Sequence, residues 1–146
     1  MNAKEYLSQA YLVDHRIDSK LEQLSELKDL SEKATATISD MPGSATRNVH
    51  RLEDVIANMI DLQNEINDDI DGLVNLKREI MQQIKTVPSP EYQLILERRY
   101  MSYKPWEQIA VEIGYSLHYL YKMHSAALQS FDEVRKKTQI LKLDTK

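Results

Sequence analysis

Apolar residues recur along most of this chain at steps of three and four, the spacing that places side chains on one face of an α-helix. Over residues 3–39 the apolar positions form one stripe: Ala10, Val13, Ile17, Leu21, Leu24, Leu27, Ala34 and Ile38. Over residues 46–86 they repeat every seven residues, at Leu52, Met59, Ile66, Leu73, Ile80 and Val87, with a companion seam at Val49, Ile56, Ile70 and Ile84. A heptad repeat sustained over this length predicts a coiled coil.

Turn-forming residues interrupt these patterns at three places: MPGS at 41–44, VPSP at 87–90 and the segment 114–116. Because Pro42 and Gly43 do not continue a helix comfortably, the two long helices are expected to fold back on each other as an antiparallel hairpin over residues 1–87. Pairing of each helix with another chain is the alternative. Two hairpins could also combine into a homodimeric four-helix bundle.

Residues 88–137 predict a compact unit of three shorter helices. The first runs from about Glu91 to Tyr100, and the second takes Pro105 at its first position and ends at Gly114. Ser116 caps the third, which runs to about Lys137. Residues 138–146 are a tail whose structure the pattern leaves open. The sequence thus predicts an all-α protein that consists of a long hairpin, a helical unit and a tail.

The second and third of these helices have the spacing of a helix-turn-helix. If Trp106 is position 1, the positions where the two helices pack are apolar: Ile109, Ile113, Tyr115, Leu120 and Met123. A small residue, Ala110, stands where the backbones cross most closely. Gly114 supplies the positive φ that reverses the chain. Two ordinary packed helices would not need this fixed offset between Ala110 and Gly114.

The stretch PEYQLILERRYMSYKPWEQIAVEIGYSLHYLYKMHSAAL resembles region 4 of bacterial sigma-70-type factors. The shared features are a leading helix that ends in ERRY, an aromatic-Glu-x-Ile-Ala helix, a glycine, a serine cap and a last helix that ends in Ala-Leu. The front half, particularly DMPGSATRNVHRLED, resembles small proteins from phages and prophages of Gram-positive bacteria, grouped with ArpU/RinA-like late regulators. The resemblance implies a transcription regulator in the cytoplasm of a bacterial host, with double-stranded promoter DNA, RNA polymerase or both as partners.

This resemblance also implies the residues that would contact DNA. The outward positions of the last helix are Ser116, Leu117, His118, Tyr121, Lys122 and Ser125. Only Lys122 among them is a fixed cation, so attraction to phosphates is expected to come also from Arg98, Arg99 and Lys104. Tyr and Ser hydroxyls can hydrogen-bond phosphates or base edges, and Tyr and Leu can contact a thymine methyl group. Protein contact is the alternative, because interfaces are enriched in exposed aromatic residues.

A polar cluster stands beside the MPGS turn: Ser44, Thr46, Arg47 and His50. It is either a helix cap with a solvated loop or a tip that docks a partner protein. The second possibility belongs to an alternative function for the chain, in which the hairpin is an adaptor for a phage or host protein and no DNA is bound.

Charge and composition narrow the function further. Residues 1–87 carry 10 basic and 16 acidic side chains, whereas residues 88–146 carry 9 and 7, which indicates two parts with different surroundings. The acidic residues between positions 61 and 71 are expected to form a solvated helix face or, alternatively, a docking face for a basic partner. No apolar run approaches the ~18 residues of a membrane span.

The inventory of reactive side chains favours no enzyme. The chain has no cysteine, its four histidines stand at no metal-ligand spacing, and it has no glycine-rich phosphate loop. The segment NDDIDG at 67–72 matches the opening of a calcium loop, but Arg78 stands where the loop needs a glutamate. We therefore expect no catalytic residue, no metal and no cofactor.

Overall fold

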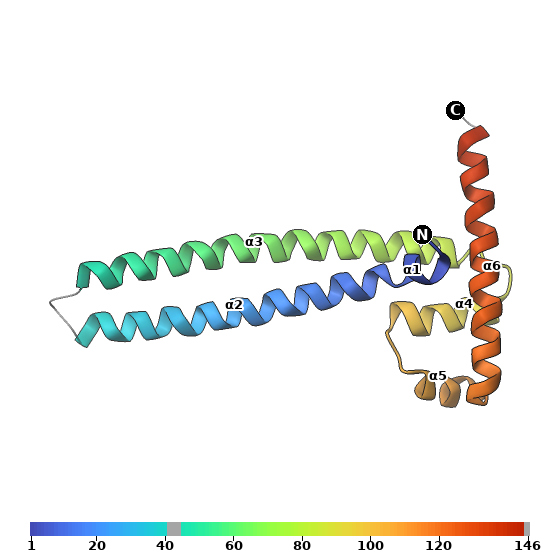
Figure 1. Cartoon of the computed structure of the whole chain (residues 1–146), viewed down its shortest axis with the longest axis horizontal. Coiled ribbons are helices and arrows are strands. Elements are labelled where there is room, and N and C mark those ends of the chain that lie inside the picture. The colour runs from blue at the N-terminus through green and yellow to red at the C-terminus, as the bar shows by residue number, and fades with distance from the viewer. Residues whose placement is uncertain (41–44, 145–146) are drawn as a thin grey trace. The chain divides into compact units, whose positions relative to one another are not determined.

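In a computed structural model of the chain, the described residues are 1–40 and 45–144, without the side chains of 37–40, 45, 46 and 48. Every regular element in these residues is helical, as predicted. In chain order the helices are α1 (Ala3–Leu7), α2 (Gln9–Asp40), α3 (Ala45–Ile84), α4 (Pro90–Leu96), the π-helical turn η2 (Glu97–Met101), α5 (Trp106–Ile113) and α6 (Leu117–Asp144) (Figure 1). The predicted all-α class is confirmed.

The chain divides into two compact units. Unit 1 consists of Met1–Leu12 and Leu73–Lys146, and unit 2 of Val13–Gly72. These divisions lie inside α2 and α3, whereas the sequence suggested boundaries at residues 87 and 137. Pro and Gly mark where helices end, but packing decides which pieces of helix belong together. Residues 138–144, expected as a tail, continue α6.

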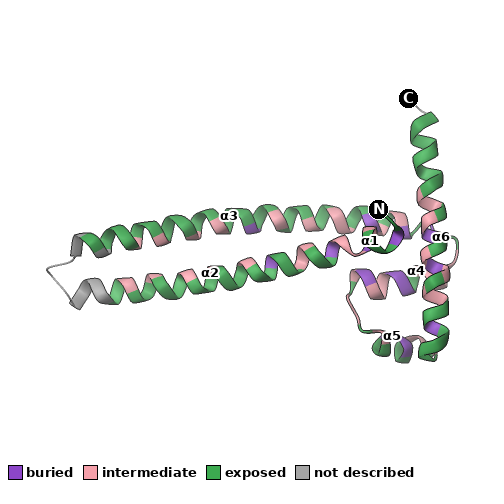
Figure 2. Ribbon diagram, in the orientation of Figure 1, coloured by how far each residue is buried: buried purple, intermediate pink, exposed green. Residues whose placement is uncertain are grey.

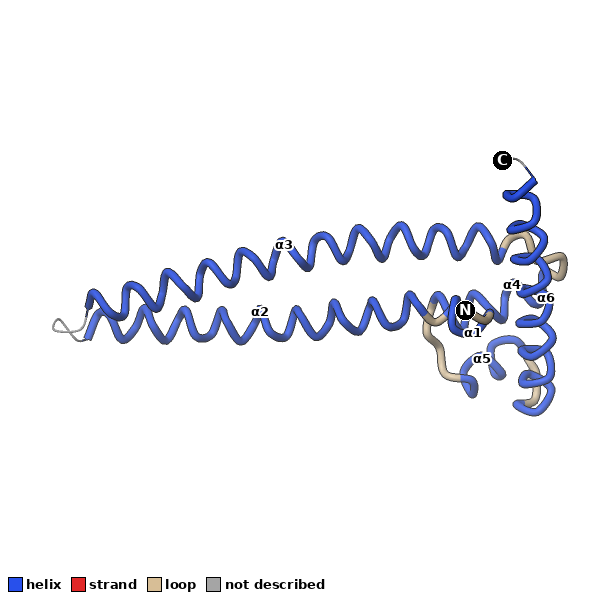
Figure 3. The backbone as a smooth tube through the Cα atoms, turned by 45° about the horizontal axis from the view of Figure 1, so that its top comes forward, coloured by secondary structure: helices blue, strands red, loops and turns tan. Residues whose placement is uncertain are grey.

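Unit 2 contains two helical segments that lie side by side and run in opposite directions (Figures 1 and 3). Lys20 of α2 joins them, because its ammonium group lies 2.6 Å from the Asp69 carboxylate and 3.7 Å from that of Glu65 on α3. Among the described residues of this unit only Ile17 and Ile66 are buried. Figure 2 accordingly shows most of both segments as exposed. Their pairing as a coiled coil stays a prediction.

Unit 1 has a continuous apolar core to which the first residues of the chain and α6 both contribute. Phe131 of α6 is fully buried at its centre. Around it pack Leu7 of α1, Ile80 and Ile84 of α3, Val87 and Leu96. Burial of a phenylalanine side chain contributes about 2–3 kcal/mol, so this contact fixes the start of the chain to α6.

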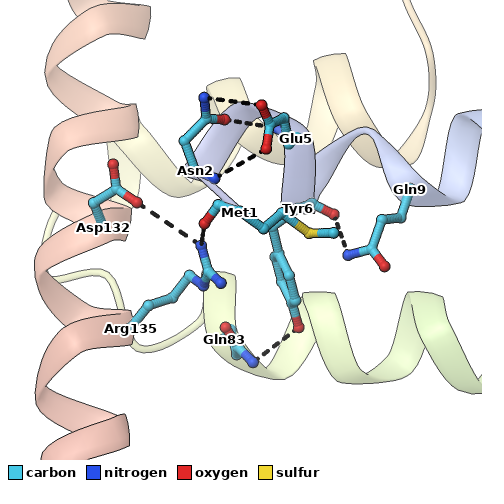
Figure 4. Close-up of polar contacts among 8 residues, drawn as sticks. All are labelled: Met1, Asn2, Glu5, Tyr6, Gln9, Gln83, Asp132 and Arg135. Atoms are coloured by element: carbon cyan, nitrogen blue, oxygen red, sulfur yellow. Dashed lines mark hydrogen bonds and ion pairs between the residues drawn. The ribbon is translucent and has the colours of Figure 1, made fainter.

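Polar contacts hold the first residues on this core (Figure 4). The Asn2 side chain accepts a hydrogen bond from the Glu5 backbone N–H at 2.8 Å, and the Glu5 carboxylate accepts one from the Asn2 N–H at 3.3 Å. This capping box satisfies two N–H groups at the start of α1, those of Asn2 and Glu5. Arg135 of α6 donates to the Met1 carbonyl at 3.3 Å, and its guanidinium lies 4.3 Å from the centre of the Tyr6 ring.

Tyr6 connects the start of the chain to α3. Its hydroxyl accepts a hydrogen bond from the Gln83 side-chain amide at 2.9 Å (Figure 4) and donates one to the Glu79 carboxylate at 3.3 Å. Burial, followed by the neighbouring Glu79 carboxylate, raises the pKa of the Tyr6 hydroxyl above its ordinary value. Tyr6 therefore stays protonated and keeps its donor role near neutral pH.

The segment predicted as one helix over 3–39 is interrupted at Ser8, between α1 and α2.

Candidate nucleic-acid interface

Helices α5 and α6 are joined by a short turn with a left-handed glycine. Pro105 is the N-cap of α5 and has an extended conformation. The sequence predicted it at the first helical position, which is one residue later. Gly114 has φ 83° and ψ 31°, and its N–H and that of Tyr115 both donate to the Ala110 carbonyl at 2.9 Å. The Ser116 hydroxyl then accepts a hydrogen bond from the Tyr119 N–H at 3.2 Å, so Ser116 caps α6 as predicted.

A small apolar cluster holds α5 and α6 together and fixes both against α4. Its buried members are Ile95, Ile109, Ala110 and Leu120, and the half-buried residues packed on them are Trp106, Ile113, Tyr115 and Met123. All six positions that the spacing assigned to packing belong to this cluster. The crossing of the two helices at Ala110 leaves one side of α6 uncovered.

The uncovered side of α6 carries the residues expected to face outward. Ser116, Leu117, His118, Tyr121, Lys122 and Ser125 are all exposed. Tyr121 leans on the edge of Trp106, with ring centres 5.7 Å apart, which restricts its side chain without burying it. The first two turns of α6 therefore present hydroxyls, one imidazole, one ammonium and apolar surface to solvent.

Two of the four expected phosphate-binding cations share one carboxylate. Arg98 and Lys104 each lie 2.8 Å from an oxygen of Glu112 on α5. Hydrogen bonds from Lys104 and then from the Gln108 amide lower the pKa of the Glu112 carboxyl below its ordinary value, so it is ionised near neutral pH. Sequence reasoning missed Glu112, because no spacing rule relates residues on the two sides of a loop. Arg98, Lys104 and Glu112 together carry one net positive charge rather than two.

Arg99 and Lys122 have different surroundings. The Arg99 guanidinium stacks 4.6 Å from the centre of the Trp106 ring and donates to the Lys104 carbonyl at 3.1 Å. Lys122 is exposed and has no ion-pair partner within the described part of the chain. The expected set of cations is thus divided into a pair that shares a carboxylate, a half-buried stacked arginine and an exposed lysine.

A half-buried histidine lies behind the exposed face and was not singled out from the sequence. The His124 imidazole Nε2 is 2.8 Å from the Tyr100 hydroxyl, and its ring meets that of Trp106 at 4.4 Å. Burial, then the charges of Lys4 and Arg99, lower the pKa of His124 to about 4. Burial also raises the pKa of Tyr100 to about 12. Both side chains are neutral at pH 7 and serve as packing and hydrogen-bonding groups.

The polar cluster predicted beside the MPGS turn is described only in part. Ser44 lies outside the described residues, as does the Thr46 side chain. Arg47 and His50 are exposed, and His50 Nδ1 lies 3.6 Å from the Glu53 carboxylate one helical turn later. In the part of the chain that the structure describes, no three His, Asp or Glu side chains are grouped as metal ligands. None of its helices is long and apolar enough to cross a membrane.

These features define an all-helical protein in which the start of one C-terminal helix is presented to solvent on a small packed unit. The chain belongs to the family described as "Protein of unknown function (DUF1492)", whose model matches residues 33–132. The match includes α3, α4, η2, α5 and the first half of α6. No curated protein and no solved structure matched the chain. The family is compatible with a phage-type protein, and the resemblance to sigma region 4 and to ArpU/RinA-like regulators stays a prediction.

Proposed function

We propose that this protein is a DNA-binding transcription regulator of a phage or prophage, and that the first turns of α6 contact promoter DNA, RNA polymerase or both. The observation that carries the proposal is the exposed face of α6. This helix follows the left-handed turn at Gly114, and Ile109 and Leu120 pack it against α5. A helix held in this way at its start fits the major groove, which admits one α-helix.

The chemistry of the face suits reading by hydroxyl and apolar groups. The Tyr121 hydroxyl and the serines at 116 and 125 can bond phosphates or base edges, and Leu117 can contact a thymine methyl group. His118 can donate or accept a hydrogen bond. Lys122 supplies a cation next to these groups.

The charge distribution limits the electrostatic part of binding. Arg98 and Lys104 share Glu112, so this cluster, Arg99 and Lys122 together supply about three net charges. Each neutralised phosphate contributes about −0.9 to the slope of log K against log salt concentration. The slope expected here is therefore about −3 or shallower, and much of the affinity has to come from the Tyr and Ser contacts.

Selection of bound fragments from a genomic DNA library tests the proposal. The library comes from the bacterium or phage that encodes the protein, and the selection is run at about 50 and about 200 mM salt. We expect enrichment of a common sequence at both concentrations, with weaker retention at the higher one. Enrichment of no sequence at either concentration would overturn DNA binding as the function.

A second function is favoured by the apolar surface of unit 2. The companion seam of α3 stays partly exposed, with Val49, Ile56 and Ile70 at 39%, 43% and 41% of their full exposure. In this alternative the helices of unit 2 bind a phage or host protein and the chain is an adaptor. The complex would then be lost when Ile56 and Ile70 are replaced by aspartate, and would survive the loss of Tyr121 and Lys122.

A further inference from the structure

A cavity of about 430 Å³ lies in unit 1, between the start of the chain and the segment that leads into α5. This volume falls within the roughly 300–1,000 Å³ of small-molecule sites. Its walls include the basic side chains of Lys4 and Arg99, the Ser8 hydroxyl and four aromatic side chains, among them Tyr11, Tyr103 and Trp106. Residues about a hundred positions apart in the sequence thus line one space.

The cavity has positive charge without a counter-charge. Lys4 stands on one wall and Arg99 on the other, and no carboxylate of the described residues lines the space. Within the same part of the chain, neither cation forms an ion pair. The neighbouring His124 is neutral at pH 7, because its pKa is about 4. An anion in the cavity would therefore be attracted by both basic side chains and meet no negative charge on its walls.

Arg99 is already oriented for such a ligand. Its guanidinium stacks on Trp106 at 4.6 Å, and one of its N–H groups donates to the Lys104 carbonyl at 3.1 Å. That bond uses one of the five N–H donors of an arginine. Because the side chain is held in place beforehand, a ligand would lose little of its binding energy in ordering it.

Aromatic rings supply much of the remaining lining. Tyr11 and Tyr103 meet edge to face, with ring centres 5.5 Å apart and planes at 74°. The Lys77 ammonium lies 4.8 Å from the centre of the Tyr103 ring. Trp106 completes the aromatic surface on the side of α5. Flat rings pack favourably on such surfaces in offset or edge-to-face contacts.

The backbone around the cavity is irregular in two places. Arg99 lies in the π-helical turn η2, and Tyr103 has a positive φ of 57°, although it is not a glycine. Both irregularities are costly, and both occur preferentially at functional sites. Here they fall within one short segment, and both affected residues line the same cavity.

We propose that this cavity binds a small organic anion that carries a flat aromatic ring system. The carboxylate or phosphate group of the ligand lies between Lys4 and Arg99, with the Ser8 hydroxyl as a further donor. The ring packs against Tyr11, Tyr103 and Trp106. Ligand binding of this kind does not rest on the proposed DNA binding. Arg99 is the one residue assigned to both, and each kind of binding is measured without the other.

Trp106 is the single tryptophan of the chain, so its fluorescence reports directly on the cavity. Titrations with adenosine 5′-monophosphate and with benzoate are compared with those of adenosine, benzamide and inorganic phosphate, and calorimetry repeats each titration. We expect saturable binding of at least one of the two organic anions, with its neutral counterpart and inorganic phosphate at least about tenfold weaker. No saturation by either anion at about millimolar concentrations, or equal binding of the neutral counterpart, would overturn the proposal.

Two variants locate the site. Lys4→Gln and Arg99→Gln each remove one cation, and each is expected to weaken binding of the anion about tenfold. Lys137→Gln removes an exposed lysine of α6 that does not line the cavity and should bind like the wild type. Lys4 is exposed, so its variant keeps the fold even if Arg99→Gln does not. Wild-type affinity in Lys4→Gln, or in a folded Arg99→Gln, would contradict the assigned site.

Discussion

At the scale of single residues, three neutral aromatic groups, Tyr100, Trp106 and His124, pack behind the exposed start of α6. His124 bonds to the Tyr100 hydroxyl at 2.8 Å and meets the edge of Trp106 at 4.4 Å. Protonation of His124 would place a charge in a half-buried site next to Lys4 and Arg99. The neutral imidazole is therefore the form on which this packing depends.

This depressed pKa makes the stability of unit 1 depend on pH. His124 titrates at about 4 in the folded chain and at about 6.5 when unfolded. Between these values the unfolded chain binds the extra proton, so stability is fully present above pH 6.5 and falls as the pH is lowered towards 4. We expect the urea midpoint of Trp106 fluorescence to fall between about pH 7 and about pH 5.

The matched variants for this measurement are His124→Gln and His118→Gln. The first removes the buried imidazole, so the midpoint should vary less with pH over the same range. The second replaces an exposed histidine of the same helix and should leave the wild-type pH dependence in place. A midpoint that changes equally with pH in wild type and His124→Gln would contradict the assignment.

Residue-level features of the site could be predicted from the sequence only where helix-turn-helix spacing or the resemblance to sigma region 4 specifies a position. The spacing predicted the buried Ile109 and Leu120, and the resemblance implied the outward positions 116, 117, 118, 121, 122 and 125, which are exposed. The shared contact of Arg98 and Lys104 with Glu112 was not, because it joins two helices across a loop. No spacing rule specifies such a contact.

At the scale of helices, a helix end could be predicted from the sequence where it needs a residue with a special backbone or capping preference. Gly114 ends α5 and Ser116 caps α6, as expected from their conformational preferences. The π-helical turn at Glu97–Met101 and the continuation of α6 to Asp144 were not foreseen. The sequence of the first segment is compatible with an ordinary α-helix, and that of the second with the end of one. In both places packing decides the conformation.

Alanine substitution at two glycines tests whether Gly114 is needed for its backbone conformation, because the expected changes in stability have opposite signs. Gly114 has φ 83°, a conformation that costs an L residue about 1–2 kcal/mol, so Gly114→Ala should destabilise unit 1 by about that amount. Gly72 lies inside α3, and a Cβ there would meet no atom of the described residues within 4 Å. Gly72→Ala should therefore stabilise the helix by about 1 kcal/mol.

Thermal and urea denaturation followed by circular dichroism measure both changes, and Trp106 fluorescence follows unit 1 alone. The two variants carry the same added methyl group, so they control for each other. Equal effects of the same sign would show that the left-handed turn at Gly114 is not what holds α5 and α6 in place.

At the scale of the whole molecule, the association of α1 with the middle of α6 was beyond prediction. Leu7 and Phe131 share one core although the apolar stripe of the first residues carries no information about its partner. The division into units therefore differs from the division marked by Pro and Gly. Periodicity predicts which side of a helix is buried. Only the folded structure shows which other helix that side packs against.

If the chain is a DNA-binding regulator and not an adaptor, the exposed seam of unit 2 predicts self-association of the chain. Ile56 and Ile70 are 43% and 41% exposed on the same side of α3, and a second copy would cover them as in a four-helix bundle. We expect sedimentation equilibrium to show a dimer, and Ile56→Asp with Ile70→Asp to give a monomer. Val111→Asp, at an apolar residue of α5 that is 83% exposed, should stay dimeric. A monomeric wild-type chain would rule out this use of the seam.

The central claim is that the exposed start of α6 binds a particular DNA sequence. The most direct test is the affinity of the purified chain for its selected fragment, compared with Tyr121→Ala/Lys122→Ala and with Lys137→Ala at about 50 and about 200 mM salt. We predict salt-dependent, sequence-specific binding that the double variant weakens at least about thirtyfold, a loss of about 2 kcal/mol, and that Lys137→Ala keeps. Binding that is independent of salt, or equal in the double variant and the wild type, would contradict the claim.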